Sequence, residues 1–442
     1  MRVSMIGAGY VGLVSGACFA DFGHQVICVD KDAAKIAALK RGEIPIFEPG
    51  LDELLESNIK QGRLEFAADT SRVGEADAVF IAVGTPSRRG DGHADLSFVY
   101  QAVREIAPLL AATAVLITKS TVPVGTGDEI ENILRNARPD ADIQVVSNPE
   151  FLREGAAIQD FKHPDRIVVG TDQERARKVL GEIYRPLYLN APPIIYVSRR
   201  TAELIKYASN AFLATKITFI NEIADLCEQV GADVQEVARG MGLDNRIGAK
   251  FLHPGPGFGG SCFPKDASAL IKTAHDHGVP LRLVEAVAAV NDQRKRAMAR
   301  KVVAACGGSI RGATIAVLGL TFKPNTDDMR EAPSISLITA LLDAGANVRA
   351  YDPEGMKQAR AVLENVTYAD HAYACMEGAD ALVIATEWDE FRALDLGRVK
   401  ALLKRPILVD LRNIYRPQDM ARWGFLYVGV GRASGKAQQG WA

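Results

Sequence analysis

The feature of this sequence that most limits its fold is a glycine-rich turn directly after a short apolar strand. Residues 3–6 are typical of a buried strand, and Gly7-Ala-Gly9-Tyr-Val-Gly12 follows at once. In this arrangement Gly7 permits a tight turn, Gly9 lets the backbone approach a pyrophosphate, and Gly12 allows a helix to pack closely on the strand. The segment therefore predicts a dinucleotide-binding unit, with the phosphates at the N-terminus of the next helix.

The residues that follow complete this unit. A helix is predicted over 13–22 and a second strand over 25–29, which ends at Asp30. A carboxylate at this point can accept hydrogen bonds from both hydroxyls of an adenosine ribose, and it disfavours a 2′-phosphate. NAD is therefore the predicted cofactor rather than NADP. The alternative is a glycine turn with a purely structural role.

Strands and helices continue to alternate up to about residue 200. Strands over 78–83 and 114–120 end in the polar turns Gly84-Thr-Pro86 and Thr121-Val-Pro123. These turns would lie at the edge where open α/β sheets bind ligands. Further strands are predicted over 143–147, 167–170 and 194–197.

Residues 201–230 contain neither Gly nor Pro and have apolar residues at helical spacing. They predict a helix about 45 Å long, which suits a spine between two domains and a subunit contact. Lys206 and Asn210 stand four residues apart and so share one face of it. Such a pair can bind a sugar hydroxyl and stabilise an oxyanion, although solvated surface residues have the same spacing.

A second α/β unit follows the helical region. Its strands are predicted over 313–318, 348–351, 381–385 and 407–410, with a helix over 334–344. The unit lacks the glycine pattern, so we expect it to hold a different nucleotide. The fold class is therefore α/β, with two Rossmann-like doubly wound domains joined by a central helical domain with a long spine helix. The predicted domains are 1–200, 201–305 and 306–442, with a flexible tail from about residue 431.

Composition excludes several classes of protein. Lys and Arg number 52 against 54 Asp and Glu, so the chain offers nucleic acid no general electrostatic attraction. No apolar run approaches the ~18 residues of a membrane span, and the N-terminus does not resemble a signal peptide. The six cysteines are scattered without metal-type spacing, so we expect no disulfide framework, no metal site and a cytoplasmic location. His275-x-His277 lacks a third ligand and is interpreted as solvated surface.

One cysteine differs from the others in its surroundings. It lies in the segment Gly255-Pro-Gly-Phe-Gly-Gly-Ser-Cys262-Phe-Pro-Lys-Asp266. Pro264 suits the first position of a helix, so Cys262 would lie just outside the helix N-terminus, close to Lys265. Both features favour the thiolate and make Cys262 a candidate nucleophile. The other cysteines are interpreted as buried structural residues: Cys18, Cys28, Cys227, Cys306 and Cys375.

Two other polar segments are candidates for function. Glu150 and Glu154 follow a strand, where they could act as general bases or merely cap a helix. Lys323 and Arg330 follow Gly319 in the second α/β unit, with acidic residues beside them. This second group is interpreted as a diphosphate clamp, with a solvated loop as the alternative.

These segments resemble the UDP-glucose/GDP-mannose dehydrogenase family from the first glycine turn to about Asn413. The Gly-Gly-Ser-Cys core is shared with the GDP-mannose branch, but Arg246-Ile-Gly248 and Cys262-Phe-Pro-Lys265 are closer to the UDP-glucose branch. Other matching motifs, in family order, are Phe47-Glu-Pro-Gly-Leu51, Ser120-Thr-Val-Pro-Val-Gly125, Ser147-Asn-Pro-Glu-Phe-Leu-Arg-Glu-Gly155, Pro164-Asp-Arg-Ile167, Glu203-Leu-Ile-Lys-Tyr207, Asn221-Glu-Ile223, Asp244-Asn-Arg-Ile-Gly248 and Phe322-Lys-Pro-Asn-Thr-Asp327.

The resemblance implies oxidation of the C6 alcohol of UDP-glucose to a carboxylate, with two NAD⁺ consumed per sugar. Cys262 would capture the aldehyde as a thiohemiacetal and then carry a thioester that water hydrolyses. Lys206 and Asn210 would stabilise oxyanions. Asp266 and Thr121 would organise a water or proton relay, and Glu150 would assist hydrolysis. The family also implies a homodimer through the central helical region.

The resemblance further implies two sets of binding residues. For the cofactor they are Gly7, Gly9, Val11, Gly12, Asp30, Lys35, Thr85, Thr121, Glu154, Lys265 and Arg330. For the nucleotide sugar they are Phe151, Leu152, Arg153, Glu154, Lys206, Asn210, Arg246, Phe251, Leu252, His253, Pro254, Gly255, Gly259 and Lys323. Phe258 departs from the family, where tyrosine is frequent, which puts any hydrogen bond from that position in doubt. His253 and Pro256 are also variants, with no effect assigned.

Three other functions are compatible with parts of the pattern. One is a dehydrogenase for another nucleotide sugar, such as UDP-N-acetylmannosamine or GDP-mannose. A second is a simple alcohol dehydrogenase of the hydroxyacid type, which needs neither Cys262 nor a second nucleotide domain. The third is a catalytically silent NAD-binding sensor, which would be expected to lose Cys262, Lys206 or Asp266, yet all three are present.

Overall fold

The computed structural model describes residues 1–88, 92–190 and 192–432. The chain forms two structural units, each with its own sheet. Residues 1–209 with 268–279 make up the N-terminal unit. Residues 210–267 with the chain from 280 onward make up the C-terminal unit.

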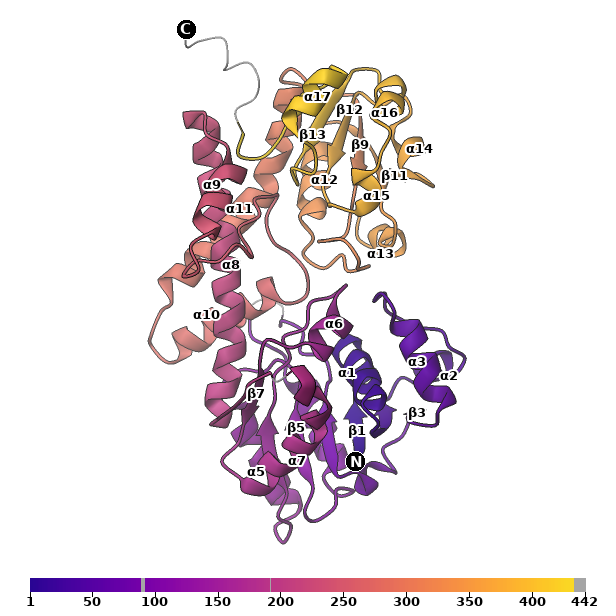
Figure 1. The fold of residues 1–442 in the computed structure, drawn as a ribbon, viewed down its shortest axis with the longest axis vertical. Helices are drawn as coiled ribbons and strands as arrows, with labels where there is room; N and C mark the ends of the chain where they lie inside the picture. Colours follow the sequence, from indigo (N-terminus) through magenta and orange to yellow (C-terminus); the bar gives the residue numbers. More distant parts are fainter. Residues whose placement is uncertain (89–91, 191, 433–442) are drawn as a thin grey trace. The chain divides into compact units, whose positions relative to one another are not determined.

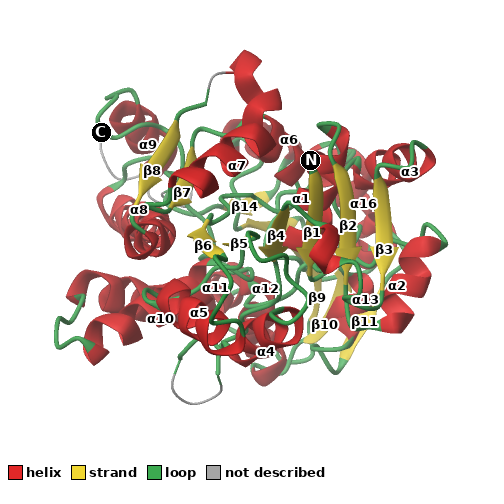
Figure 2. Cartoon of the chain, turned by 90° about the horizontal axis from the view of Figure 1, so that it is seen from below, coloured by secondary structure: helices red, strands yellow, loops and turns green. Residues whose placement is uncertain are grey.

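The sheet of the N-terminal unit contains the strands β1 (Arg2–Ile6), β2 (Gln25–Val29), β3 (Leu64–Ala67), β4 (Ala78–Ile81), β5 (Val115–Thr118), β6 (Gln144–Ser147), β7 (Ile167–Gly170) and β8 (Ile194–Val197). Their order is β3-β2-β1-β4-β5-β6-β7-β8 (Figure 1). Figure 2 shows β4, β1, β2 and β3 side by side in this order. Neighbouring strands are parallel except β6 and β7, which are antiparallel.

Helices cover both faces of this sheet. They are α1 (Tyr10–Asp21), α2 (Ala33–Lys40), α3 (Leu51–Lys60), α4 (Ser97–Ile106), α5 (Thr126–Ala137), α6 (Ala157–Lys162) and α7 (Glu174–Tyr184), with the 3₁₀ turns η1 (Val73–Glu75) and η2 (Arg185–Asn190). One face packs on α1, α3, α6 and α7, and the other on α4 and α5. Every residue of β4 and β5 is buried, which explains why these strands are continuous apolar runs rather than alternating ones.

The sheet of the C-terminal unit contains β9 (Thr314–Leu318), β10 (Asn347–Tyr351), β11 (Val366–Tyr368), β12 (Ala381–Ile384), β13 (Ile407–Asp410) and β14 (Leu426–Val428). All six are parallel, in the order β11-β10-β9-β12-β13-β14. This is the 3-2-1-4-5-6 order of a Rossmann fold, which the first six strands of the N-terminal unit also follow. Its helices are α12 (Pro333–Asp343), α13 (Met356–Arg360), α14 (Ala372–Met376), α15 (Asp389–Arg392), α16 (Leu396–Leu402) and α17 (Pro417–Trp423).

Along the sequence, four helices come after the last strand of the first sheet and before the first strand of the second. They are α8 (Arg199–Val230), α9 (Val234–Gly242), α10 (Phe263–Asp276) and α11 (Arg282–Ala305). The 32-residue α8 is the predicted spine helix. It lies beside α11 (Figure 1), where Arg294 forms an ion pair with Asp225 at 2.9 Å. None of the helices among the described residues combines the length and apolar composition needed to cross a membrane.

The predicted fold class is confirmed, and each predicted strand is present with boundaries that differ by at most two residues. Three strands were not predicted: β3, β11 and β14. They are edge strands of three or four residues with several exposed or half-buried positions, so they lack the apolar pattern of a central strand. α10 begins at Phe263, one residue before the predicted start at Pro264.

The flexible tail predicted from about residue 431 stays a prediction, although Gly431 and Arg432 themselves make specific contacts. The Gly431 N–H donates to Glu228 at 2.7 Å, and Arg432 forms an ion pair with Asp233 at 3.2 Å. These contacts join the end of the chain to α8 and to the N-cap of α9, which sequence spacing alone does not reveal. Residues 433–442 lie outside the described residues.

The glycine turn after β1 has the geometry that its pattern predicts. Gly7 has a φ of +105°, which favours glycine. A Cβ at Gly12 would lie 1.8 Å from the carbonyl oxygen of Gly7, so only glycine allows α1 to pack here. A Cβ at Gly9 would meet nothing within 4 Å, so this position faces open space. Gly7 and Gly12 are therefore required by the fold for different reasons, whereas the surroundings of Gly9 would admit a Cβ.

We expect Gly12→Ala to lower the free energy of unfolding by about 2–4 kcal/mol, because the added methyl group clashes with rigid backbone. Gly9→Ala is the matched control and should change it by no more than about 0.5 kcal/mol. Urea unfolding followed by circular dichroism measures both variants. Equal stability of the two would contradict the packing described for this turn.

Candidate active site

The turn between β1 and α1 fits a dinucleotide. Gly9 is the N-cap of α1 and offers no side-chain hydrogen bond to the first N–H groups of the helix, which include that of Val11. Such N–H groups, together with the helix dipole, are suited to a phosphate. The open space beside Gly9 leaves room for a pyrophosphate close to the backbone. These observations fit NAD.

Asp30 follows β2 and is held by three hydrogen bonds. It accepts from the backbone N–H of Ala8 at 2.9 Å, from that of Asp32 at 3.0 Å and from Nζ of Lys35 at 2.8 Å. Burial acts to raise the pKa of Asp30, but these hydrogen bonds, foremost that from Lys35, outweigh it and lower the pKa. Asp30 is therefore an anion at neutral pH, and the predicted cofactor residue Lys35 lies beside it.

Two predicted threonines meet at the carboxyl ends of neighbouring strands. Thr85 follows β4 and Thr121 follows β5, and Oγ1 of Thr85 donates to the Thr121 carbonyl at 2.9 Å. Ser120 adds a hydrogen bond to the Val83 carbonyl at 2.7 Å. The two turns therefore form one polar edge, as the topology predicts.

Lys206 of α8 and Glu150, in the loop after β6, form a buried ion pair. Nζ of Lys206 donates to Oε1 of Glu150 at 3.1 Å, and the two side chains are only 4% and 6% exposed. The other carboxylate oxygen accepts from the N–H of Leu152 at 2.6 Å. The interpretation of Lys206 as a solvated surface residue is therefore excluded.

The ring of Phe151 lies next to two cations. Its centroid is 5.3 Å from Nζ of Lys206 and 3.6 Å from the guanidinium carbon of Arg166. Both distances are within the range of cation–π attraction. Arg166 was not predicted as a site residue, although it lies in one of the family motifs. Arg153, by contrast, is half exposed and binds Asp160 through its side chain.

Lys119 follows β5 and is a second buried cation near this edge. Nζ donates to Oδ1 of Asn148 at 3.2 Å and to the Tyr184 hydroxyl at 3.1 Å. It also lies 5.8 Å from the ring centroids of Phe161 and Tyr184. Burial lowers the pKa of Lys119 to about 8, the nearby charge of Glu150 opposing this effect.

The C-terminal unit contributes a second polar group around Asp266, in the first turn of α10. Asp266 is 1% exposed and accepts from Nδ2 of Asn210 at 2.6 Å and from Nζ of Lys265 at 2.7 Å. Its own N–H donates to the Cys262 carbonyl at 2.8 Å. Three predicted site residues, Asn210, Lys265 and Asp266, are therefore joined directly.

Cys262 immediately precedes α10, as predicted, and it is the one partly exposed cysteine; the other five are buried. Burial raises the pKa of Cys18, Cys28 and Cys375 to about 12, and it also raises the pKa of Cys227 and Cys306. Those five thiols are therefore poor nucleophiles, which confirms their structural interpretation.

The loop before Cys262 is held by amide side chains. Asn221 accepts from the N–H of Gly255 at 2.8 Å, and Asn291 both accepts from the N–H of Phe258 and donates to its carbonyl. Arg294 donates to the Gly255 carbonyl at 2.7 Å. Gly259 is required because a Cβ there would lie 2.3 Å from the carbonyl oxygen of Glu331.

Phe258, the departure from the family pattern, is 6% exposed and packs in an apolar cluster with Ala214 and Val287. Its ring also meets that of Phe263 edge to face at 6.0 Å. Phe251, which begins the predicted substrate segment from Phe251 to Gly255, has a positive φ of 66°. Leu252 and Pro254 are buried, whereas His253 is exposed.

Three predicted binding residues have side-chain contacts with residues close to them in the chain, and the Arg330 carbonyl also accepts from the N–H of Gly260, in the loop before Cys262, at 2.8 Å. Arg246 is 90% exposed and binds Asp244, two residues earlier. Arg330 likewise bonds with Asp328 at 2.8 Å, and Nζ of Lys323 lies 5.3 Å from the Phe322 ring centroid. Their roles in binding stay predictions.

Asp352, which follows β10, occupies the position in the second sheet that Asp30 occupies in the first. It is fully buried and accepts hydrogen bonds from backbone N–H groups, from the Thr321 hydroxyl and from Nε1 of Trp388. Its acceptor capacity is therefore used within the chain, and it does not present a ribose-binding carboxylate.

Sequence reasoning missed three residues that organise these groups: Lys119, Glu203 and Asn291. Glu203 is buried and accepts from the N–H groups of Gly125 and Gly127 and from the Ser147 hydroxyl. In the sequence, each of these residues stands out only as a charged or amide residue next to apolar ones. This pattern does not indicate which residue it will bind in the fold.

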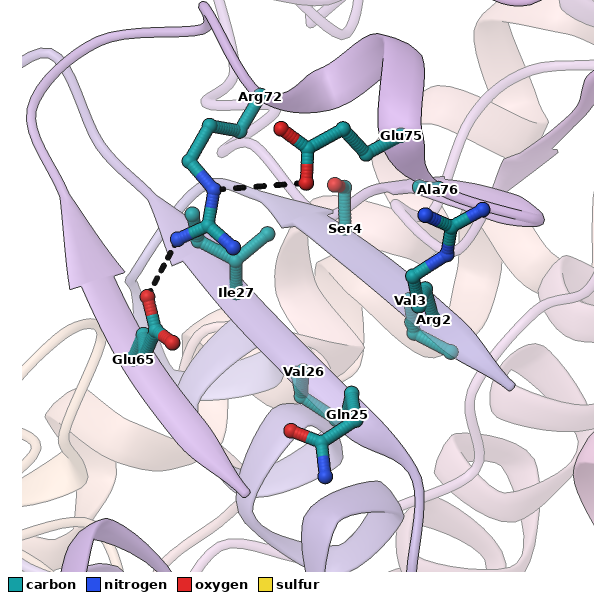
Figure 3. Close-up of a pocket in the computed structure, with 10 residues that line it drawn as sticks. All are labelled: Arg2, Val3, Ser4, Gln25, Val26, Ile27, Glu65, Arg72, Glu75 and Ala76. Atoms are coloured by element: carbon teal, nitrogen blue, oxygen red, sulfur yellow. Dashed lines mark hydrogen bonds and ion pairs between the residues drawn. The ribbon is translucent and has the colours of Figure 1, made fainter. Parts of the chain in front are cut away.

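A cavity of about 160 Å³ lies elsewhere on the N-terminal sheet (Figure 3). It is lined by residues of η1 and of the amino-terminal halves of β1 and β2, with Arg72 bound to Glu65 and Glu75. Within this unit, the predicted cofactor residues Gly7, Asp30, Thr85 and Thr121 follow the opposite, carboxyl ends of the strands, and no predicted cofactor or substrate residue lines this cavity.

Three models of one family match successive parts of the chain. They are the NAD binding domain over residues 1–188, the central domain over 200–293 and the UDP binding domain over 316–417 of the UDP-glucose/GDP-mannose dehydrogenase family. The chain belongs to this family. The predicted resemblance is therefore confirmed.

Individual relatives agree along the whole length. The chain is 67% identical to a UDP-glucose 6-dehydrogenase of Rhizobium meliloti, over 98% of this chain and 100% of the relative. A UDP-glucose dehydrogenase from Pyrobaculum islandicum is 39% identical, with a TM-score of 0.89 and 98% of both chains covered. A UDP-D-ManNAc dehydrogenase from Pyrococcus horikoshii is 28% identical, with a TM-score of 0.86, 98% of this chain and 100% of that chain being covered.

Lys119 predicts a pH dependence of stability. Because its pKa is lowered to about 8 in the folded chain and is about 10.5 in an unfolded one, the unfolded state binds more protons between these values. The contribution of Lys119 to stability should therefore rise with pH between about 8 and 10.5 and level off below 8. We measure the melting temperature of Lys119→Met minus that of the wild type. This difference should be lower at pH 9.5 than at pH 7.5, because only the wild type gains stability over this range. Parallel pH profiles would contradict this expectation.

Proposed function

We propose that this chain is a UDP-glucose 6-dehydrogenase that oxidises UDP-glucose to UDP-glucuronate with two NAD⁺ per sugar. The observation that carries the proposal is a partly exposed cysteine at the start of α10, next to the buried Asn210–Asp266–Lys265 group. The 67% identity to a UDP-glucose 6-dehydrogenase supports the choice of substrate. Another nucleotide sugar stays the alternative, because the family includes such enzymes.

The N-terminal unit would hold the dinucleotide. The N–H groups at the start of α1 would bind the pyrophosphate, and Asp30 would accept from the ribose hydroxyls. Thr85, Thr121 and Glu154 contribute from the carboxyl edge of the same sheet. When bound, NAD⁺ supplies the hydride acceptor for both oxidations.

Lys206 and Asn210 would stabilise negative charge on the C6 oxygen. Both are donors fixed by a buried carboxylate, Glu150 for Lys206 and Asp266 for Asn210. Donors held in place by the protein need little reorganisation as charge develops, which is the basis of oxyanion stabilisation. Asp266, which already accepts two hydrogen bonds, keeps Asn210 oriented.

Cys262 would act at the aldehyde stage. Its thiolate sulfur bonds to C6, and the carbonyl electron pair moves to the oxygen, which takes a proton to give a thiohemiacetal. Oxidation of this adduct by two electrons leaves a thioester. The covalent bond prevents escape of the aldehyde between the two oxidations.

Hydrolysis would end the cycle. Water adds to C6 of the thioester, the C–S bond breaks, and the electron pair returns to the sulfur of Cys262. Glu150 takes the proton from the attacking water, either directly or through a water held near Thr121.

The nucleotide end of the substrate would bind the C-terminal unit, whose family model is a UDP binding domain. Lys323 is the candidate diphosphate ligand there. The loop from Phe251 to Gly255 and Gly259 would contact the sugar diphosphate through its backbone. Residues 151–154 and Arg246 complete the proposed set. The three-domain division at residues 200 and 305 belongs to the same proposal.

The enzyme would form a homodimer through α8. Phe212, Phe219, Leu226 and Val230 recur at intervals of seven, seven and four residues, and they are between 45% and 66% exposed. An apolar stripe of this kind on a helix is typical of a surface that is covered by a second helix. The scattered free cysteines support a cytoplasmic location.

Cys262→Ala tests the chemistry. We expect the wild type to form two NADH per UDP-glucose, and the variant to lose UDP-glucuronate formation by a factor of about 1,000 or more, because no thioester can form. Cys306→Ala, which removes a buried thiol, is the matched control and should keep the stoichiometry of two. Absorbance at the NADH band with chromatography of the sugar products measures both. One NADH per sugar in the wild type would reject the proposal.

A substrate panel distinguishes the alternative. GDP-mannose and UDP-N-acetylmannosamine are compared with UDP-glucose by kcat/KM under the same conditions. A higher value for either would reassign the substrate while leaving the cysteine mechanism in place.

Phe212→Glu combined with Phe219→Glu tests the dimer. Two charges on the apolar stripe should weaken self-association by about 30-fold or more, measured by sedimentation velocity. Val362→Glu is the control, since Val362 is 51% exposed on the C-terminal unit and lies outside the stripe. A monomeric wild type, or a double variant that associates normally, would argue against this interface.

A further inference from the structure

Glu48 is a buried carboxylate to which neither sequence nor proposed mechanism gives a role. It lies between α2 and α3, in the motif Phe47-Glu-Pro-Gly-Leu51, and is 6% exposed. Among the described residues, no lysine or arginine forms an ion pair with it. Burying a carboxylate without a cation is costly unless several donors hydrogen-bond to it.

The donors to Glu48 come from two segments, one at the proposed phosphate site and one at the end of the loop that carries proposed substrate residues. The first is the Tyr10 hydroxyl, in the first turn of α1, where the dinucleotide phosphates would bind. The others are the N–H of Gly155 at 2.6 Å and the N–H of Ala157 at 2.7 Å. Gly155 ends the loop 151–155, which carries the proposed substrate residues.

The two loops also meet directly at this point. The Tyr10 hydroxyl accepts from the N–H of Gly155 at 3.2 Å while it donates to Glu48. Burial and the bond to Glu48 raise the pKa of Tyr10, so the hydroxyl stays protonated and keeps donating. Gly155 has a φ of +77°, so the backbone here turns in a way that orients Glu154, its neighbour.

We propose that Glu48 and Tyr10 are positioning residues that couple the cofactor loop to the substrate loop, so that UDP-glucose and the dinucleotide strengthen each other's binding. This inference rests on the proposed function, which assigns loop 151–155 to the sugar nucleotide. A ligand that orders one loop through a shared anchor also orders the other. The second ligand then has less ordering to do, which is positive coupling.

A glutamine cannot replace Glu48 in this role. The carboxylate accepts with both oxygens, whereas an amide has a single acceptor oxygen and an NH₂ group that would face the N–H of Gly155 or Ala157. Tyr10→Phe is the milder change. It removes only the hydroxyl that connects the two loops and leaves Glu48 bound to loop 155–157.

The test measures the dissociation constant of NADH by its fluorescence, with and without saturating UDP-glucose. These two ligands form a complex without turnover, because the alcohol needs NAD⁺ for oxidation. In the wild type we expect UDP-glucose to lower the Kd of NADH by about five-fold or more. In Tyr10→Phe and in Glu48→Gln the ratio should fall below about two-fold.

Tyr351→Phe is the matched control. It removes a tyrosine hydroxyl that bonds Glu390 at 3.3 Å in the C-terminal unit, so it should leave the ratio at the wild-type value. Melting temperatures of all variants show whether they fold. A merely structural role would lower the melting temperature and leave the ratio unchanged, which would overturn the inference.

The outcomes separate this inference from the proposed function. A wild type that oxidises UDP-glucose but shows a ratio near one overturns the coupling alone. A wild type that neither oxidises nor binds UDP-glucose overturns the proposed function and the coupling with it.

Discussion

Two buried carboxylates, Glu150 and Asp266, hold the polar residues of α8, and the chemistry proposed for this chain depends on them. Lys206 and Asn210 lie one helical turn apart, yet each binds a different carboxylate. Charges this deeply buried are stable only when they are paired, so each donor has one preferred orientation. A fixed ammonium and a fixed amide are what an enzyme needs next to an oxygen that becomes negative during the reaction.

The same principle explains the neighbouring groups. Glu203 satisfies backbone N–H groups at the start of α5, and Lys119 is bound by neutral oxygens and aromatic rings. Each is a polar side chain inside an otherwise apolar layer. Their geometry is restricted because leaving a buried polar partner without a hydrogen bond costs free energy. At the carboxyl edge of the first sheet, Lys119 and Glu203 therefore have defined partners within the chain.

Local patterns in the sequence predicted much of this arrangement. The glycine turn, the position of Cys262 before a helix and the separation of Lys206 from Asn210 depend only on residues close together in the chain, and all three were found. Glu48 and Asn291 could not be placed in this way. Glu48 binds Gly155, which is 107 residues away in the sequence, and Asn291 binds Phe258, which is 33 residues away. Only the folded chain brings these residues together. The short edge strands were missed because partial exposure removes their apolar pattern.

The first six strands of the N-terminal sheet have the same order as the C-terminal sheet, but Asp30 and Asp352 make different hydrogen bonds at the same position. Asp30 has a partly accessible carboxylate beside a lysine, whereas Asp352 accepts hydrogen bonds from its own loop, from Leu320 and Thr321 after β9, and from Trp388. Topological likeness therefore does not make the halves interchangeable. Introducing three glycines after β9 would not create a second dinucleotide site, because the Asp352 carboxylate already accepts hydrogen bonds within the chain and would not be available to a ribose. Breaking the hydrogen bonds of this buried carboxylate would cost free energy, so the difference between the two sheets is built into the packing of the second one.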